Sequence, residues 1–115
     1  MAMEESILKT VRQFIGPSAS YDVFDNTLLI HVNSAFSRLC QLGVGPSTPF
    51  RVCDESTTWS DFMHPDDMPP DVIEYICIQT RLMFDTPANS TTTNSLKEQA
   101  AKLEWLLKEV ARFGY

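Results

Sequence analysis

A chain of 115 residues provides enough material for one domain with a single hydrophobic core. Hydrophobic residues make up 43% of it and charged residues 21%, which excludes intrinsic disorder and indicates a packed globular domain. Two glutamates, Glu4 and Glu5, precede an interrupted apolar pattern, which argues against a secretion signal. No apolar run approaches the roughly 18 residues of a membrane-spanning helix, so no membrane association is expected.

The first two helices are predicted from apolar residues that recur at three- and four-residue spacing. One helix spans residues 4–15 and ends at Gly16. Its stripe consists of Ile7, Leu8, Val11, Phe14 and Ile15. The second helix begins at a cap that Asp25 or Asn26 provides, and it ends at Gly43. Its stripe consists of Leu28, Val32, Ala35, Phe36, Leu39 and Leu42.

After the second helix the helical period is lost, and Gly, Pro, Ser and Thr dominate. Residues 50–53 are predicted to be extended, which suits one arm of a small hairpin. Thr57 or Thr58 can cap a short helical turn that follows. The rings of Trp59 and Phe62 are expected to pin this turn onto the core.

The third helix is predicted over residues 70–84, with Pro70 suited to its first turn. Its broad apolar face consists of Val72, Ile73, Ile76, Cys77, Thr80, Met83 and Phe84. The polar residues 89–95 indicate a loop or a frayed helix start. Ser95, with Glu98 three residues later, fits a capping box, so the fourth helix is expected to begin there. Its stripe consists of Leu96, Ala100, Leu103, Leu107, Val110 and Phe113.

These elements predict an all-α fold, a single-domain bundle of about four helices over residues 1–115 with an irregular central loop. On the solvent side of the last helix, Glu104 and Lys108 are spaced to pair one turn apart. The core is expected to bury the residues at the centres of the stripes. These are Leu28, Val32, Phe36, Ile76, Phe84, Leu103 and Leu107.

The net charge of −6 is concentrated in one central segment, residues 54–71, which contains no Lys or Arg. Its acidic residues are Asp54, Glu55, Asp61, Asp66, Asp67 and Asp71. The rest of the chain carries nine acidic and nine basic residues. An acidic segment repels phosphate, which argues against nucleic-acid binding through it. The alternative is a plain solvated loop, and Pro65, Pro69 and Pro70 favour loose packing in either case.

The residues that usually carry enzymatic chemistry are few and isolated. His31 lies beside the stripe of the second helix, and His64 is interpreted as a loop histidine near acidic residues. The spacing of the aspartates does not match a calcium loop, and no glycine-rich phosphate-binding pattern occurs. The cysteines Cys40, Cys53 and Cys77 are far apart and are expected to be reduced thiols. We therefore expect no catalytic residue, no metal site, no cofactor and no enzymatic activity.

Aromatic residues off the helical stripes, and those at the end of the chain, indicate either surfaces for protein partners or additional core packing. The candidates for partner contacts are Tyr21, Trp105, Phe113 and Tyr115. Trp and Tyr are favoured at interfaces, and several such residues are notable in a domain of this size. Taken alone, these features predict a helical interaction domain.

The order of short motifs along the chain is more specific than any one of them. The motifs are HVNSAF at residues 31–36, LGVGP at 42–46, TTWSDF at 57–62, LMFDTP at 82–87 and LEWL at 103–106. In this order and spacing, the chain resembles the small head-tail connector (adaptor) proteins of long-tailed bacteriophages and of prophages in Gram-positive bacteria. The resemblance covers nearly all of the chain, from Ile7 to Leu107.

The resemblance implies a non-enzymatic helical subunit of the virion neck, folded in the bacterial host cytoplasm. It also implies a dodecameric ring of neighbouring connector subunits below the phage portal protein, in contact with stopper or tail proteins. DNA would pass through the ring without specific binding. The acidic segment is a candidate either to face the channel, where it would let DNA slide, or to lie at an interface with a neighbouring subunit. We expect the free protein to be a monomer or a weak oligomer that assembles on the portal.

The alternative interpretation is a cytosolic helical domain for protein–protein interaction or regulation, which would use the same exposed aromatic residues. A small DNA-binding regulator is a more distant alternative, because the acidic balance of the chain disfavours it.

Overall fold

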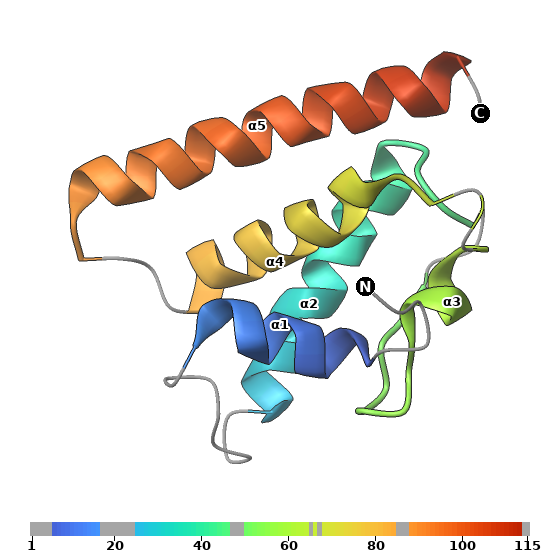
Figure 1. Cartoon of the computed structure of the whole chain (residues 1–115), viewed down its shortest axis with the longest axis horizontal. Coiled ribbons are helices and arrows are strands. Elements are labelled where there is room, and N and C mark those ends of the chain that lie inside the picture. The colour runs from blue at the N-terminus through green and yellow to red at the C-terminus, as the bar shows by residue number, and fades with distance from the viewer. Residues whose placement is uncertain are drawn as a thin grey trace.

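The computed structural model describes residues 6–16, 25–46, 50–64, 66, 68–84 and 88–113. The helices are α1 (Ile7–Ile15), α2 (Asp25–Gln41), α3 (Trp59–Phe62), α4 (Pro70–Phe84) and α5 (Ser90–Phe113). In Figure 1, α4 lies between α5 on one side and α1 on the other, and α2 packs across α4. The described residues contain no strand, only an isolated antiparallel bridge between Ser6 and Thr58. The prediction of an all-α bundle is confirmed.

The core is built mainly on α2 and α4, whose apolar stripes face each other. Six of the seven side chains predicted to form its centre are buried. These are Leu28, Val32, Phe36, Ile76, Leu103 and Leu107. The seventh, Phe84, is only half-buried, because it is the last residue of α4. Tyr75 and Ile78 are buried on further sides of α4, so this helix is covered from several directions.

The first helix is anchored at both ends by its own sequence. The side chain of Ser6 accepts a hydrogen bond from the backbone N–H of Lys9 at 3.2 Å, which caps the N-terminus of α1. Gly16, at a φ of 100°, ends the helix as predicted. The predicted start at residue 4 lies outside the described residues. Phe14 belongs to the apolar stripe of α1 but lies at its margin and is 40% exposed.

The last helix begins six residues earlier than the capping box predicted. The side-chain oxygen of Asn89 accepts hydrogen bonds from the backbone N–H groups of Thr91 and Thr92, at 2.8 and 3.2 Å. Asn89 therefore caps α5, and the predicted cap at Ser95 was wrong, since Ser95 is an exposed residue inside the helix. The first turns of α5 consist of polar residues that are mostly exposed. No apolar period therefore marks them in the sequence.

Residues 50–62 of the central segment are held against the core by aromatic packing. Residues 65 and 67 lie outside the described residues, so loose packing of the stretch that contains the prolines stays a prediction. Phe36, Phe50 and Phe62 pack with ring centroids 4.9–5.1 Å apart, and Trp59 lies 6.1 Å from Phe36. The indole N–H of Trp59 donates to the hydroxyl of Thr10 at 3.2 Å. The predicted pinning of α3 onto the core is confirmed. Such pairs stabilise a fold by about 0.5–1.5 kcal/mol each beyond the area that they bury.

The turn before this aromatic cluster requires a glycine. Gly45 has a φ of 93°, and a Cβ at this position would lie 2.6 Å from the ring of Phe62. Both the backbone conformation and the close approach therefore exclude a larger residue. The ring of Phe62 can reach the core only because the chain passes it without a side chain here.

Candidate interaction surfaces

The position of α5 is fixed by one carboxylate that two other helices share. Glu104 on α5 accepts hydrogen bonds from Arg38 on α2 at 3.0 and 3.2 Å, and from the hydroxyl of Tyr75 on α4 at 2.8 Å. Burial and this hydrogen bond raise the pKa of Tyr75 above its ordinary value, and the carboxylate also raises the pKa of Arg38. The expected pair of Glu104 with Lys108 was wrong, because Glu104 points inward and Lys108 is exposed.

Three acidic residues of residues 54–71, which we call the acidic segment, have structural roles within the chain. Asp54 accepts a hydrogen bond from the backbone N–H of Ser56 at 2.8 Å, and its bonds from Ser56 lower the pKa of Asp54. Asp61 accepts from the backbone N–H of Thr58 at 2.8 Å and so caps α3. Glu55 forms an ion pair with Arg12. These three carboxylates therefore stabilise the local structure of the acidic segment.

Arg12 joins the acidic segment to the first two helices. Its side chain is 14% exposed and pairs with both Asp25 on α2 and Glu55. Burial would lower the pKa of Arg12, but the hydrogen bonds and charges of the two carboxylates outweigh burial and raise it. A buried guanidinium with two acidic partners is a structural link between α1, α2 and the acidic segment.

The remaining acidic residues carry no comparable role in the described structure. Asp71 lies in the first turn of α4, where the helix dipole favours a negative charge. The side chain of Asp66 is 89% exposed, and its backbone N–H donates to His64 at 3.1 Å. Asp67 lies outside the described residues. Asp66 is therefore the described residue of the acidic segment whose carboxylate is most clearly exposed to solvent.

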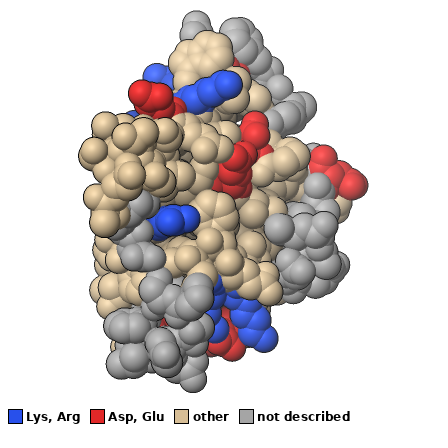
Figure 2. All heavy atoms as spheres, turned by 60° about the vertical axis from the view of Figure 1, so that its left-hand side comes forward, with Lys and Arg blue, Asp and Glu red and all other residues tan. Residues whose placement is uncertain are grey.

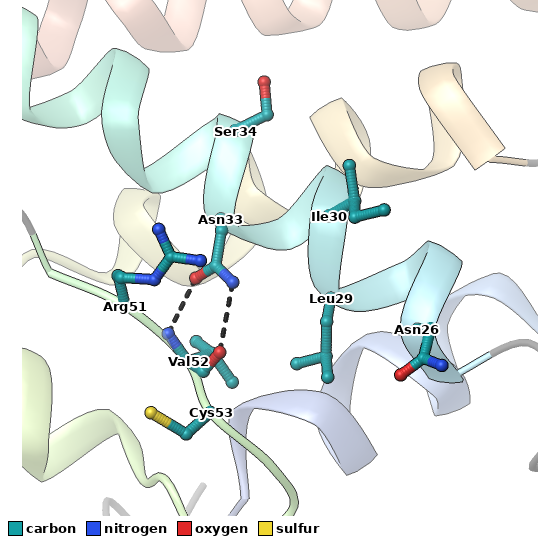
Figure 3. A pocket seen from close by; sticks show the side chains of 8 residues that line it. All are labelled: Asn26, Leu29, Ile30, Asn33, Ser34, Arg51, Val52 and Cys53. Carbon is teal, nitrogen blue, oxygen red and sulfur yellow. Dashed lines mark hydrogen bonds between the residues drawn. The ribbon is translucent and has the colours of Figure 1, made fainter.

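A hollow of about 740 Å³, here called the α2 hollow, lies between α2 and the extended residues 51–53. Figure 3 shows Leu29 and Ile30 on its helical side and Arg51 and Cys53 on the other. Ile30 is 67% exposed, more than Phe14 or Trp105.

The wall of this hollow also explains why residues 50–53 pair with no strand among the described residues. Asn33 accepts a hydrogen bond from the backbone N–H of Val52 at 2.7 Å and donates to its carbonyl at 3.0 Å (Figure 3). One side chain of α2 therefore satisfies both backbone groups that a neighbouring strand would otherwise satisfy. The predicted extended conformation of this stretch is present, and the predicted hairpin arm was wrong for the described residues.

A second hollow, of about 540 Å³, runs between α1 and α4, and we call it the α1–α4 groove. Its lining includes Gln13, Phe14, Pro70, Ile73, Glu74 and Cys77. Most of this surface is apolar, and Glu74 is the charged side chain among the described lining residues. Burial, with a smaller effect from the charge of Glu74, raises the pKa of the Cys77 thiol to about 12.

Of the four aromatic residues predicted to contact partners, the structure describes the side chain of one. Trp105 on α5 is 62% exposed and faces away from the bundle. Tyr21 and Tyr115 lie outside the described residues, as does the side chain of Phe113 at the end of α5. Phe14 and Ile30 are exposed apolar residues that sequence reasoning missed, because both belong to helices with strong apolar patterns.

Comparison with known families decides what kind of protein presents these surfaces. A model of the phage connector protein family matches residues 7–112, which includes nearly all of the described structure. The chain belongs to the phage connector protein family. Neither the curated proteins nor the solved structures contain a significant match. The head-tail connector resemblance drawn from the sequence motifs is confirmed, and the family is a structural one whose members are virion components.

In the part that the structure describes, the phage connector protein shows no metal-ligand cluster and no membrane-spanning helix. Within the described ranges, no three His, Cys, Asp or Glu side chains gather as metal ligands would. No helix among the described residues combines the length and apolar character needed to cross a membrane. On the face shown in Figure 2, basic and acidic side chains are interspersed, and uncharged residues cover most of the surface. Surfaces of this kind suit protein–protein contacts.

Proposed function

We propose that this phage connector protein is the adaptor subunit that forms a ring below the portal and extends the channel through which DNA leaves the capsid. The family match over residues 7–112 carries this proposal. An all-helical fold with four longer helices supports it. The partners would be the portal protein on one side, stopper or tail proteins on the other, and neighbouring copies of the same subunit.

The charge distribution gives the adaptor ring a physical reason to conduct DNA. Each Lys or Arg that neutralises a phosphate adds salt-dependent affinity for DNA. The acidic segment contains six acidic residues and no Lys or Arg, and the side chain of Asp66 is 89% exposed. Repeated around a ring, a surface of this kind repels the phosphate backbone and leaves DNA free to slide. We propose that the acidic segment faces the channel or its tail-side rim.

The assembly of the ring can be tested with the purified subunit and the portal protein of the phage that encodes it. We expect the free subunit to sediment as a monomer or weak oligomer, and to co-sediment with portal at micromolar concentration. Assembly on the portal is expected because the portal supplies the symmetry that closes the ring. A subunit that fails to co-sediment with its portal at that concentration would contradict the adaptor function.

The channel-facing role can be tested by reversing the charge of Asp66 and Asp67 to lysine. The change at Asp66 should leave the fold intact, because its side chain is 89% exposed and exposed charges contribute little to stability. The reversed ring should retain DNA in a salt-sensitive manner, and genome ejection should slow. The matched control is the neutral variant Asp66→Asn with Asp67→Asn, which removes the same charges without adding cations. Normal assembly with no gain in DNA retention would show that the segment is ordinary solvated surface.

A further inference from the structure

The proposed ring needs two different surfaces on each subunit, and the structure offers a pair that match. Resting on that proposed function, we propose that the outer face of α5 around Trp105 docks into the α1–α4 groove of the neighbouring copy. We call this outer face the Trp105 ridge. It comprises Trp105 and the residues one turn away on either side, namely Ala101, Lys102, Lys108 and Glu109.

Trp105 points away from the core of its own subunit. Trp105 is two residues from both Leu103 and Leu107, which are buried, so it lies about 200° around the helix from each of them. Its side chain therefore points to the side opposite the buried stripe of α5 and is 62% exposed. Tryptophan is among the residues that contribute most to protein interfaces. An outward Trp105 thus fits a partner better than solvent.

The α1–α4 groove is the complementary feature. It is an open, mostly apolar hollow in which Phe14 is 40% exposed and Ile73 is half-buried. Its volume of about 540 Å³ lies within the range of about 300–1,000 Å³ that holds small organic ligands, and is ample for an indole ring. An aromatic ring seated on Phe14 would gain both burial and a ring contact.

The charges around the two surfaces are of opposite sign. Lys102 and Lys108 flank Trp105 on both sides. Glu109 is the acidic residue of the ridge, and Glu104, next to Trp105, is paired with Arg38 inside the bundle. The groove carries Glu74, and Asp71 lies one turn earlier on α4. Glu74 already accepts a hydrogen bond from Gln99, but a carboxylate can accept several. Lysines at the rim of an apolar contact would therefore face carboxylates.

The α2 hollow is a poorer fit for the Trp105 ridge. Arg51 is the charged side chain among its described lining residues, and it would face Lys102 and Lys108 with the same sign.

The Trp105 ridge and the α1–α4 groove also lie on different sides of α4, because α5 is on one side of it and α1 on the other (Figure 1). A contact between two different surfaces is heterologous, and heterologous contacts generate rings when the rotation closes.

Photo-crosslinking tests the docking directly. Trp105 is replaced by p-benzoylphenylalanine, which keeps an aromatic group on the ridge, and the assembled complex with portal is irradiated and digested. We expect crosslinks between copies that map to Phe14 and Ile73. The matched control carries the same group at Thr92, an exposed residue in the first turn of α5, and should not label the groove. Crosslinks from position 105 to the α2 hollow, or to the portal alone, would overturn the proposal.

A charge exchange tests the same contact by function. Lys102→Glu with Lys108→Glu should weaken association between copies, and Glu74→Lys in the same chain should restore part of it. Trp105→Ala should weaken the association by about 30-fold, the effect of losing a hot-spot residue at the centre of an interface. All variants change exposed side chains, so circular dichroism should show an unchanged fold.

Unchanged assembly of Trp105→Ala on the portal would refute the docking but leave the adaptor function standing. Failure of the wild-type subunit to bind portal would instead refute the adaptor function.

Discussion

Glu104 and Trp105 are adjacent on α5, and their side chains point to different sides of the helix. Glu104 reaches Arg38 and Tyr75 inside the bundle, whereas Trp105 is 62% exposed. Because α5 packs through a narrow stripe of Ala100, Leu103 and Leu107, the polar contacts of Glu104 help to set its rotation about its own axis. The internal hydrogen bonds of one residue therefore determine where its neighbour points.

Removal of the Glu104 carboxylate should destabilise the bundle. The variant Glu104→Ala leaves the hydroxyl of Tyr75, a buried residue, without its acceptor, so the free energy of unfolding should fall by about 1–3 kcal/mol. Lys108→Ala, an exposed change on the same helix, should alter it by less than about 0.5 kcal/mol. Urea denaturation followed by circular dichroism measures both. Equal stability of the two variants would mean that the shared carboxylate does not hold α5.

A second prediction concerns the backbone of Val52, which depends on one side chain. Asn33→Ala removes the acceptor for the N–H of Val52 and the donor to its carbonyl, and Val52 is 2% exposed. Leaving these groups unpaired should lower the free energy of unfolding by about 1–3 kcal/mol. Asn26→Ala, at an exposed position of the same hollow, provides the control and should be nearly neutral. A neutral Asn33→Ala would show that water replaces the side chain.

Local sequence signals determined how well each helix could be predicted. The predicted third helix agrees with α4 at both ends, because Pro70 suits a first turn and the apolar period is unbroken up to Phe84. The start of α5 was missed because Asn89 and the residues after it are polar and face solvent, so no apolar period marks them. Phe14 fits its period but lies at a margin that no neighbouring helix covers.

The contacts that shape the surfaces could not be predicted from spacing. Asn33 and Val52 are 19 residues apart, and Tyr75 and Glu104 are 29 residues apart. Nothing within either local pattern shows that these pairs meet, since only the packing of α2, α4 and α5 brings them together. The exposure of Trp105 was a different case. Its position off the apolar stripe was visible in the sequence, and the structure places it at the surface.

The aromatic cluster should dominate the stability of the bundle. Phe36 is 1% exposed and contacts the rings of Phe50, Trp59 and Phe62. Phe36→Ala should therefore lower the free energy of unfolding by about 3–5 kcal/mol, the range for emptying a buried aromatic site. Phe14→Ala is the matched control, and its effect should be well below that range because Phe14 is 40% exposed. Thermal and urea unfolding measure the difference, and equal losses would contradict the assigned core.

The three free cysteines should differ in reactivity toward thiol reagents. The thiolate is the reactive form, and a pKa of about 12 leaves about one Cys77 thiol in ten thousand ionised at pH 8. Cys77 is also buried, whereas Cys53 is exposed. Native protein at pH 8 should therefore be labelled at Cys53 and spared at Cys77 until urea unfolds it. Mass spectrometry of the labelled peptides identifies the sites, and rapid labelling of native Cys77 would show that the α1–α4 groove admits the reagent to its floor.

The same buried thiol predicts how stability changes at alkaline pH. The pKa of Cys77 is about 12 in the folded chain and 9.0 when unperturbed, as in the unfolded chain. Below pH 9 the thiol is protonated in both the folded and the unfolded state, so it does not change the free energy of unfolding with pH. Above pH 9 the unfolded state binds fewer protons than the folded one, and the free energy of unfolding should fall by up to about 1.4 kcal/mol per pH unit. Cys77→Ala removes this contribution, while other titrating groups act equally in both proteins. The wild-type protein should thus lose more stability than Cys77→Ala between pH 9 and 10.5 in urea denaturation, and parallel curves would contradict the burial of the thiol.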